Sequence, residues 1–348
     1  MRFSLLYFAN RDAAGAAEQY DLLLESARIA DRNGFEALWV PERHFHAFGG
    51  AYPNPAVAAA AVAAVTSRIR IRAGSVVLPL NDVLRVTEDW AVVDNISGGR
   101  VDLAFAAGWN ANDFVLAPAA FARRRTLLPD MIAEFTGLWR GEHLSRVNGK
   151  GDQVEVTVFP RPVQRLPGIW LTASSSIRTF RRAGSSGANV LTAMLFMSLD
   201  ELGTKIAAYR QAREDSGLDP YGGTVTLMLH THVGPTTTHV RETVRPAFLE
   251  YLRSSTTLWG QEMRRVRAAA DADPLTLLEF AFDRYFRRAA LFGSVERCRE
   301  FVGRLERTGV DEVACLIDFG LSRQETVNGL GPLSELVGDR RLAGTVDT

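Results

Sequence analysis

The chain has 348 residues, 47% of them hydrophobic and 23% charged, and its 40 Lys and Arg residues balance its 40 Asp and Glu residues. This composition predicts a globular protein with a sizeable core. A net charge of zero without a charged tail argues against nucleic acid or an anionic membrane as a partner. The two cysteines have no metal-like spacing, which predicts reduced thiols in a cytoplasmic protein. The apolar runs are too short for a membrane span.

Short apolar runs alternate with helical patterns in the first third of the chain. Strands are predicted at 2–8, 37–40, 69–78 and 100–106. Helices are predicted at about 16–33, from Pro55, and from Asn81 or Asp82 to about Ile96. Alternation of strands and helices with short connections favours a parallel sheet covered by helices.

Predicted strands and helices alternate again later in the chain, where two segments interrupt the alternation. A helix is predicted at 123–140, and further strands at 169–173, 188–192, 224–233 and 312–317. Residues 141–167 contain alternating valines typical of a hairpin outside the sheet. Residues 238–291 are mostly helical and too long for one crossover, so an insertion is predicted there.

Eight strands alternating with helices predict a single-domain (β/α)8 barrel over residues 1–348, with excursions at about 141–167 and 238–290. The alternative is an open doubly wound sheet, which would usually show a Gly-rich turn after the first strand. Residues 8–15, F-A-N-R-D-A-A-G, show none.

The loop after the second predicted strand, 41–55, concentrates polar side chains. Pro41 ends the apolar run, and Glu42, Arg43, His44 and His46 follow among aromatic residues, before glycines and prolines that fix the bends. In an α/β barrel, the loops at the carboxyl ends of the strands carry the chemistry. This loop is therefore the first candidate for an active site.

Several short motifs together resemble the bacterial luciferase-like flavin monooxygenase superfamily. They are W-V-P-E-R-H-F at 39–45, N-P at 54–55, G-S-V-V-L-P at 74–79, V-T-E-D-W at 86–90, I-S-G-G-R-V at 96–101, G-W-N at 108–110, the serines 174–176 and F-G-S-V-E-R-C at 292–298. The resemblance covers residues 1–113, and again 168–192 and 292–318. G-W-N with the serine triplet looks most like the branch found beside non-ribosomal peptide and polyketide synthases.

The resemblance implies a barrel that binds FMN at its mouth. Reduced FMN, supplied by a separate flavin reductase, would react with O2 through a C4a-peroxyflavin and oxygenate a biosynthetic intermediate, free or bound to a carrier protein. Hydroxylation and Baeyer–Villiger insertion both remain open. The alternatives are an F420-dependent oxidoreductase on the same barrel and a non-catalytic flavin-binding partner subunit. Relatives often pair through early helices, which suggests a homodimer.

His44 of the first loop is the leading catalytic candidate, together with Asn110 of the loop after the fourth strand, and Arg43 is the candidate substrate-binding residue of the first loop. His44 is expected to donate a hydrogen bond or shuttle a proton beside the flavin, or else to order the loop. Luciferases proper carry two adjacent histidines here, and the first matches Arg43. Arg43 is therefore expected to bind an anionic group of the substrate, or to pair with Glu42, which itself is expected to hold the loop.

The resemblance also implies where the flavin sits. In the family, Gly74-Ser75 often forms a non-proline cis peptide beneath the isoalloxazine ring. Ala107, Gly108 and Trp109 are expected beside the flavin. Asn110 is expected to bond a flavin or substrate carbonyl, and Asn112 and Asp113 to cap the next helix. The alternative for 108–110 is a tight loop with a half-buried Trp.

The serine triplet is the expected phosphate site. Amides at a helix start, hydroxyls and the helix dipole together favour a phosphate dianion, although ordinary N-capping by serine is the alternative. Arg178 is expected to supply charge, because the arginine that relatives often carry after the fourth strand is Ala107 here. The expected cofactor-binding residues of this region are Ala173, Ser174, Ser175, Ser176, Arg178, Thr179 and Met194.

One further candidate lies on the seventh predicted strand. His230 and His232 are two residues apart, so they are expected to share one face. If that face points inward, His230 can contact the substrate. No third ligand of suitable spacing accompanies the pair, so no metal is predicted.

Overall fold

The computed structural model describes residues 1–8, 16–46, 49–174, 176–194, 197–258 and 274–344. Eight parallel strands form its centre: β1 (Arg2–Leu6), β2 (Ala37–Val40), β3 (Arg70–Val77), β4 (Val101–Ala106), β7 (Gly168–Thr172), β8 (Asn189–Ala193), β9 (Val225–Val233) and β11 (Glu312–Leu316). Each pairs with its neighbours, and β1 pairs with β11, which closes the barrel. The predicted (β/α)8 barrel and its eight strands are confirmed.

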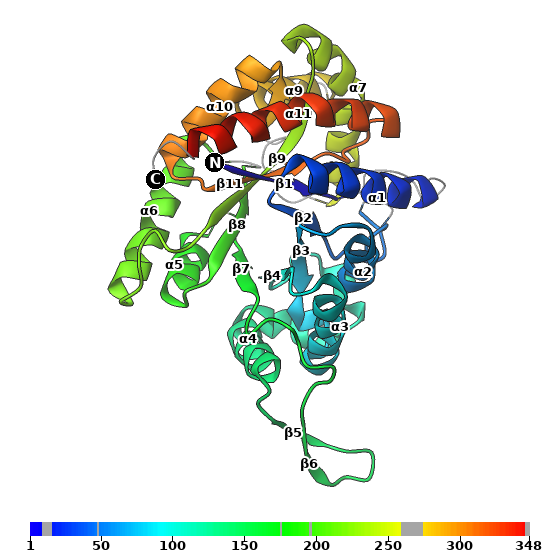
Figure 1. The fold of residues 1–348 in the computed structure, drawn as a ribbon, viewed down its shortest axis with the longest axis vertical. Coiled ribbons are helices and arrows are strands. Elements are labelled where there is room, and N and C mark those ends of the chain that lie inside the picture. Colours follow the sequence, from blue (N-terminus) through cyan, green and yellow to red (C-terminus); the bar gives the residue numbers. More distant parts are fainter. Residues whose placement is uncertain (9–15, 47–48, 175, 195–196, 259–273, 345–348) are drawn as a thin grey trace.

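Helices follow the barrel strands and cover them from outside (Figure 1). The helices are α1 (Ala16–Asn33), α2 (Pro55–Val65), α3 (Val83–Ser97), α4 (Arg124–Arg140), α5 (Ile177–Ser185), α6 (Leu199–Asp215), α7 (Thr237–Leu258), α9 (Pro274–Arg288), α10 (Val295–Thr308) and α11 (Arg323–Gly344), with 3-10 turns η2 (Leu78–Leu80), η3 (Ala111–Val115) and η4 (Pro118–Arg123). Among these described helices, none has an apolar stretch long enough to cross a bilayer.

The two predicted excursions differ in shape. After α4, the strands β5 (Leu144–Val147) and β6 (Gln153–Val156) pair as an antiparallel hairpin that projects away from the barrel (Figure 1). After β9, the helices α7 and α9 pack on the carboxyl-terminal part of the barrel. Both excursions leave the parallel sheet uninterrupted, because they lie between barrel strands.

The prediction of helix up to residue 291 was wrong at its end. Helix α9 stops at Arg288, and Ala290–Gly293 forms a short strand, β10. The reason lies in β9, which is nine residues long whereas β8 has five. Strand β8 pairs with β9 only as far as Met228, so the edge of β9 from His230 onward needs another partner, and β10 supplies it.

The amino-terminal end of the barrel interior is closed by charged and aromatic residues, which we call the barrel floor: Arg72, Asp102, Glu312, Trp39 and Trp170. Arg72 Nη1 donates to both carboxylate oxygens of Glu312 at 2.8 Å, and its Nε donates to Asp102 at 3.0 Å. Burial alone would lower the pKa of Arg72, but the two carboxylates raise it above its ordinary value. The ion cluster is therefore fully paired within the protein.

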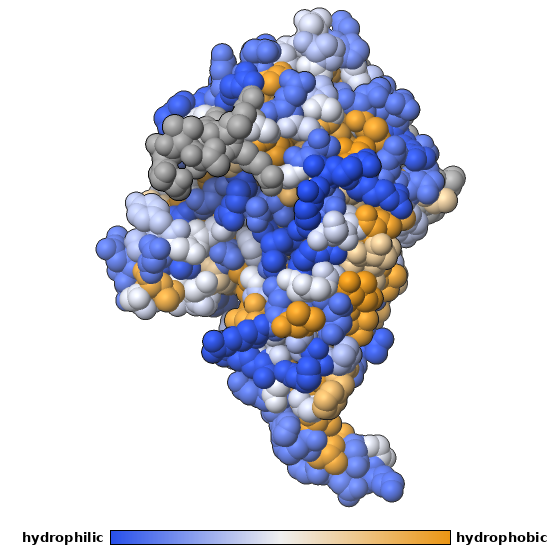
Figure 2. Space-filling model, in the orientation of Figure 1, coloured by the Kyte–Doolittle hydropathy of each residue, from blue (hydrophilic) through white to orange (hydrophobic). Residues whose placement is uncertain are grey.

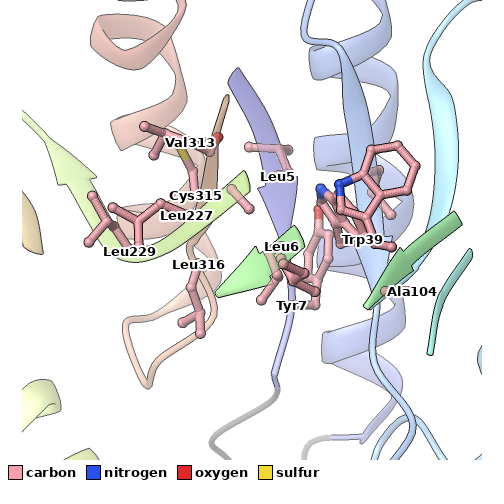
Figure 3. Close-up of a cluster of buried hydrophobic side chains, with 14 of the residues drawn as sticks. Leu5, Leu6, Tyr7, Trp39, Ala104, Leu227, Leu229, Val313, Cys315 and Leu316 are labelled. Carbon is pink, nitrogen blue, oxygen red and sulfur yellow. Dashed lines mark hydrogen bonds between the residues drawn. The ribbon is translucent and has the colours of Figure 1, made fainter. Parts of the chain in front are cut away.

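Apolar side chains surround this floor. Figure 3 shows residues of β1, β2, β9 and β11 packed together, with the Trp39 ring beside Leu6 and Tyr7. Trp39 is fully buried, and its Nε1 donates to Ser4 Oγ at 2.8 Å. The floor thus fixes one end of the barrel and leaves the opposite end, the mouth, for ligands.

Candidate active site

The loop after β2 is attached to the end of β3 by one carboxylate. Glu42 accepts hydrogen bonds from the Val77 amide at 2.6 Å and from Asn81 Nδ2 at 3.0 Å. Its Oε1 also lies 3.0 Å from His44 Nε2. Because a carboxylate only accepts, His44 Nε2 carries the proton in this contact. The other ring nitrogen, Nδ1, makes no hydrogen bond to the described part of the chain.

Arg43 lies beside His44 but points into a buried site. It is 4% exposed, and its guanidinium carbon lies 4.9 Å from the Trp109 ring centre and 5.4 Å from that of Phe8. Burial lowers the pKa of Arg43, and the nearby Asp113 carboxylate opposes that shift. Gly49 allows this placement, because a Cβ there would lie 2.8 Å from Arg43 Cδ.

The loop after β4 brings an acidic group to the same place. Asp113 is buried, and burial raises its pKa, while Arg43 and then His44 act in the opposite direction. Its carboxylate accepts a 2.6 Å hydrogen bond from Asn110 Nδ2. The acid that acts on Arg43 is thus Asp113, whereas Glu42 is engaged with His44, Asn81 and the Val77 amide.

Asn110 itself caps the 3-10 helix η3. Its Oδ1 accepts from the Asn112 amide at 3.2 Å while its Nδ2 holds Asp113. The expectation that Asn112 and Asp113 cap this helix was wrong, since the cap lies at the first residue of the N-x-N-D sequence. Both polar atoms of Asn110 are used within its own loop, so its geometry is that of a positioning residue.

Two glycines let the backbone approach the mouth closely. Gly74-Ser75 is a non-proline cis peptide inside β3, where the register with β4 shifts, and a Cβ on Gly74 would lie 3.1 Å from Trp39 Cβ. Gly108 has φ +80°, and a Cβ there would lie 2.7 Å from Val77. The Ser75 hydroxyl hydrogen-bonds that of Thr172 on β7, which joins two strands across the mouth.

The start of α5 follows β7 at the same end of the barrel. Ala173 is buried, whereas Ser174, Ser176 and Arg178 are exposed. Ser176 is the N-cap, but its side chain makes no capping hydrogen bond. At α6, by contrast, Ser198 and Glu201 form a complete capping box. The first amides of α5 therefore face outward without a side-chain cap.

The remaining predicted cofactor-binding residues lie around these groups, except for Ser175. The Thr179 amide donates to Ser176 O at 3.0 Å, so Thr179 closes the first turn of α5. Met194 follows β8 and is 4% exposed. Ala107 is half-buried after β4, and Trp109 is 46% exposed. Ser175 lies outside the described residues.

His230 lies within a set of rings that we call the aromatic wall: Phe248 and Tyr251 of α7, Tyr285 of α9, and Phe319 after β11. The His230 ring centre lies 4.6 Å from that of Tyr251 and 4.9 Å from that of Phe248, both edge-on. Burial lowers the pKa of His230 to about 3. Its Nε2 is buried without a hydrogen-bond partner in the described structure.

His232 does not share this environment. Its Nδ1 would lie 2.7 Å from a Cβ on Gly329 of α11, and burial lowers its pKa to about 4. Although His230 and His232 are only two residues apart on β9, their imidazoles therefore lie in different surroundings. Only His230 contacts the aromatic wall.

The mouth therefore has two unlike sides. The loops after β2 and β4 supply polar and charged side chains, namely His44, Arg43 and Asp113, while α7 and α9 supply rings. Sequence reasoning missed Asp113 as a site residue and Tyr251 altogether. Asp113 had a local signal, three residues after Asn110, but Tyr251 lies in a long helix whose apolar pattern is typical of any core helix.

The comparisons with known proteins decide the family. The model of the luciferase-like monooxygenase family matches residues 1–312. The chain belongs to this family. The oxygenase component of flavin-dependent trigonelline monooxygenase from Acinetobacter baylyi is 28% identical over 335 residues, which cover 92% of this chain and 90% of that protein.

Solved structures agree with this luciferase-like fold. Monooxygenase RslO1 from Streptomyces bottropensis superposes with a TM-score of 0.81 at 21% identity, covering 98% of this chain and 100% of that one. The oxygenating constituent of 3,6-diketocamphane monooxygenase from Pseudomonas putida, solved in complex with FMN, gives 0.76 at 19% identity, covering 96% and 95%. At these identities the likeness concerns the fold.

Proposed function

We propose that this chain is the oxygenase of a two-component flavin-dependent monooxygenase, with reduced FMN bound at the barrel mouth. The observation that carries the proposal is convergence at the mouth: within a luciferase-like barrel, the loop holding His44, the backbone at Gly74-Ser75 and Gly108, and the uncapped start of α5 all lie at the carboxyl end of the strands. The trigonelline relative is itself an oxygenase component, which supports a separate flavin reductase as partner.

The residues at α5 fit the phosphate of FMN. A helix start offers amide donors and the positive end of the helix dipole, and the Ser176 side chain does not occupy them. Ser174, Ser176 and Arg178 are exposed there and would add hydroxyl donors and charge. Gly74, Ser75, Ala107, Gly108, Trp109, Ala173, Thr179 and Met194 would surround the rest of the cofactor.

Reduced FMN, when bound, would supply the two electrons that activate O2, one atom of which enters the substrate while the other leaves as water. The protein positions the reactants and moves protons. Glu42 fixes the His44 ring through Nε2, so Nδ1 is the atom that would accept or return a proton at the mouth. Asn110 holds Asp113, whose carboxylate favours the charged form of Arg43, and Arg43 would bind an anionic group of the substrate.

The substrate proposed is a natural-product intermediate with apolar and aromatic character, free or presented on a carrier protein. The aromatic wall supplies the apolar contact, and the buried Nε2 of His230 would hydrogen-bond one polar group of the substrate. A neutral imidazole suits an uncharged group, whereas Arg43 suits an anionic one. Hydroxylation and Baeyer–Villiger insertion are both compatible with this arrangement.

A homodimer is proposed on the surface over α2 and α3, where Figure 2 shows apolar side chains gathered. Val57 is 68% exposed and Ile96 is 51% exposed. Such a patch is a common site of association between protein chains.

Flavin reconstitution tests the proposed function. The purified chain is mixed with reduced FMN and then with O2, and the flavin spectrum is followed by rapid mixing. A bound flavin that passes through an absorbance transient before oxidised FMN returns is the expected result. Binding of F420 with hydride transfer and no reaction with O2 would replace the monooxygenase with an F420-dependent oxidoreductase. Failure to bind any flavin would reject both.

A further inference from the structure

Three exposed arginines lie on α5 and on the adjoining first turn of α4, and we call them the rim arginines: Arg125, Arg181 and Arg182, of which Arg182 is in the last turn of the short helix α5. Arg181 and Arg182 lie three and four residues after Arg178, so the three share one face of α5. The opposite face carries the buried residues Phe180, Ala183 and Gly184. Arg182 is five residues from the start of the helix, about 7.5 Å along its axis.

Contacts between α5 and α4 place Arg125 on the same rim. Arg182 Nη1 donates to the Arg125 carbonyl at 3.4 Å. The preceding residue, Arg124, donates through Nε to the Gly108 carbonyl at 3.0 Å. The first turn of α4 is therefore fixed to the loop that enters the mouth, and the rim arginines border the opening where the phosphate of FMN is proposed to sit.

The charges of the rim arginines are not neutralised by the described part of the chain. None of the three takes part in an ion pair there. Some exposed arginines on other helices are paired, as Arg85 with Asp89 at 3.2 Å and Arg323 with Glu25 at 2.7 Å. Three neighbouring positive charges that have no carboxylate partner in the described part of the chain give this rim a positive local potential.

We propose that the rim arginines capture FMN by long-range attraction to its phosphate dianion before the phosphate reaches α5. This inference rests on the proposed function, since it assumes that the mouth binds FMN. The rim arginines do not have to touch the bound cofactor. Charges that surround an opening raise the local concentration of an oppositely charged ligand and accelerate its association. A flavin released by a separate reductase has to be collected from solution, which is where such acceleration acts.

The test compares two triple variants that lose the same net charge. Arg125→Gln/Arg181→Gln/Arg182→Gln removes the rim arginines. Arg32→Gln/Arg140→Gln/Arg307→Gln removes charges from the last turns of α1, α4 and α10, at the floor end of the barrel. Association and dissociation of FMN and of riboflavin, which lacks the phosphate, are followed by stopped-flow flavin fluorescence.

The rim variant is expected to associate with FMN about tenfold more slowly at low salt, with its dissociation rate little changed. Riboflavin should associate with all three proteins at one rate. Adding salt should abolish the difference for FMN, because the Debye length falls from about 30 Å at 0.01 M to about 3 Å at 1 M. The floor-end variant should behave as the unmodified protein.

Each contrary result is decisive. FMN association that is equally fast in the rim variant and the unmodified protein would overturn the capture role, even though FMN binds and the proposed function survives. Equal slowing in both triple variants would also overturn it, because net charge and not the rim would then be responsible. Failure of the unmodified protein to bind FMN or riboflavin would instead reject the proposed function.

Discussion

The two ends of the barrel use similar side chains in opposite ways. At the floor, Arg72 is saturated by Glu312 and Asp102, and no group is left for a ligand. At the mouth, His44 keeps Nδ1 available and His230 keeps a buried Nε2 without a partner in the described structure. The comparison shows that completeness of pairing, and not residue type or burial, separates stabilising groups from candidate reactive groups.

Removing the mouth imidazole should have the largest effect on activity. His44→Ala is expected to lower product formation by about 10²–10⁴-fold, the usual contribution of a positioned proton donor or acceptor. Stability should change only modestly, since the ring makes one hydrogen bond, to Glu42, and Glu42 keeps two other donors, the Val77 amide and Asn81. Product is measured by mass spectrometry with reduced FMN and O2, and the urea midpoint serves as the folding control. Unchanged product formation would remove His44 from the mechanism.

Disrupting the barrel floor should lower stability and leave flavin binding unchanged, the reverse of what is expected for His44→Ala. Glu312→Gln leaves Arg72 without its main counter-charge and is expected to lower the free energy of unfolding by about 3–5 kcal/mol. FMN affinity of the remaining folded protein should be unchanged, because the mouth is at the other end.

The matched control for the floor is Glu250→Gln, which breaks an exposed pair with Arg253 and should cost at most about 1 kcal/mol. Urea unfolding measures both variants. Equal losses of stability in the two variants would show that burial does not increase the contribution of the Glu312–Arg72 pair to stability.

The dependence of stability on pH should show that His230 is buried as a neutral imidazole. The pKa of His230 is about 3 in the folded protein and 6.5 ordinarily, so the unfolded chain binds the extra proton between these values. The contribution of neutral His230 to the free energy of unfolding is therefore full above pH 6.5 and is lost as the pH falls toward 3. His230→Phe should therefore reduce the slope of stability with pH in this window by up to about 1.4 kcal/mol per pH unit.

A control histidine makes that result specific. His143 is exposed, and His143→Gln should leave the slope as it is in the unmodified protein. His232, also buried, should preserve part of the slope in the His230 variant. Urea unfolding at several pH values between 4 and 7 gives the slopes. An identical slope in the His230→Phe protein would mean that this imidazole is already protonated in the fold.

The barrel could be predicted from the sequence because its signals are local. Apolar runs of strand length between helical patterns located all eight barrel strands, and Pro41 marked the end of β2. Strand β10 was missed because its cause is distant: it fills the edge that β9 exposes beyond the end of β8. The unpaired edge of β9 results from the different lengths of β8 and β9, so it produces no signal in the sequence of residues 290–293.

The candidate site was predicted from the same kind of local signal. His44, Arg43 and Gly108 each follow a predicted strand, and Gly74 lies within one. Asp113 was assigned to capping because its neighbours in sequence suggested no other use. Tyr251 and the aromatic wall depend on how α7 folds back over the barrel, which is a matter of tertiary packing and not of local pattern.

The position of the aromatic wall has a practical consequence for redesign. Most of its rings belong to α7 and α9, a continuous stretch between β9 and β10, whereas the proposed phosphate contacts come from α5 and the structural charges from the strand starts. Because the rings and the proposed phosphate contacts lie on different helices, substitutions in the aromatic wall are expected to alter substrate choice without altering FMN binding.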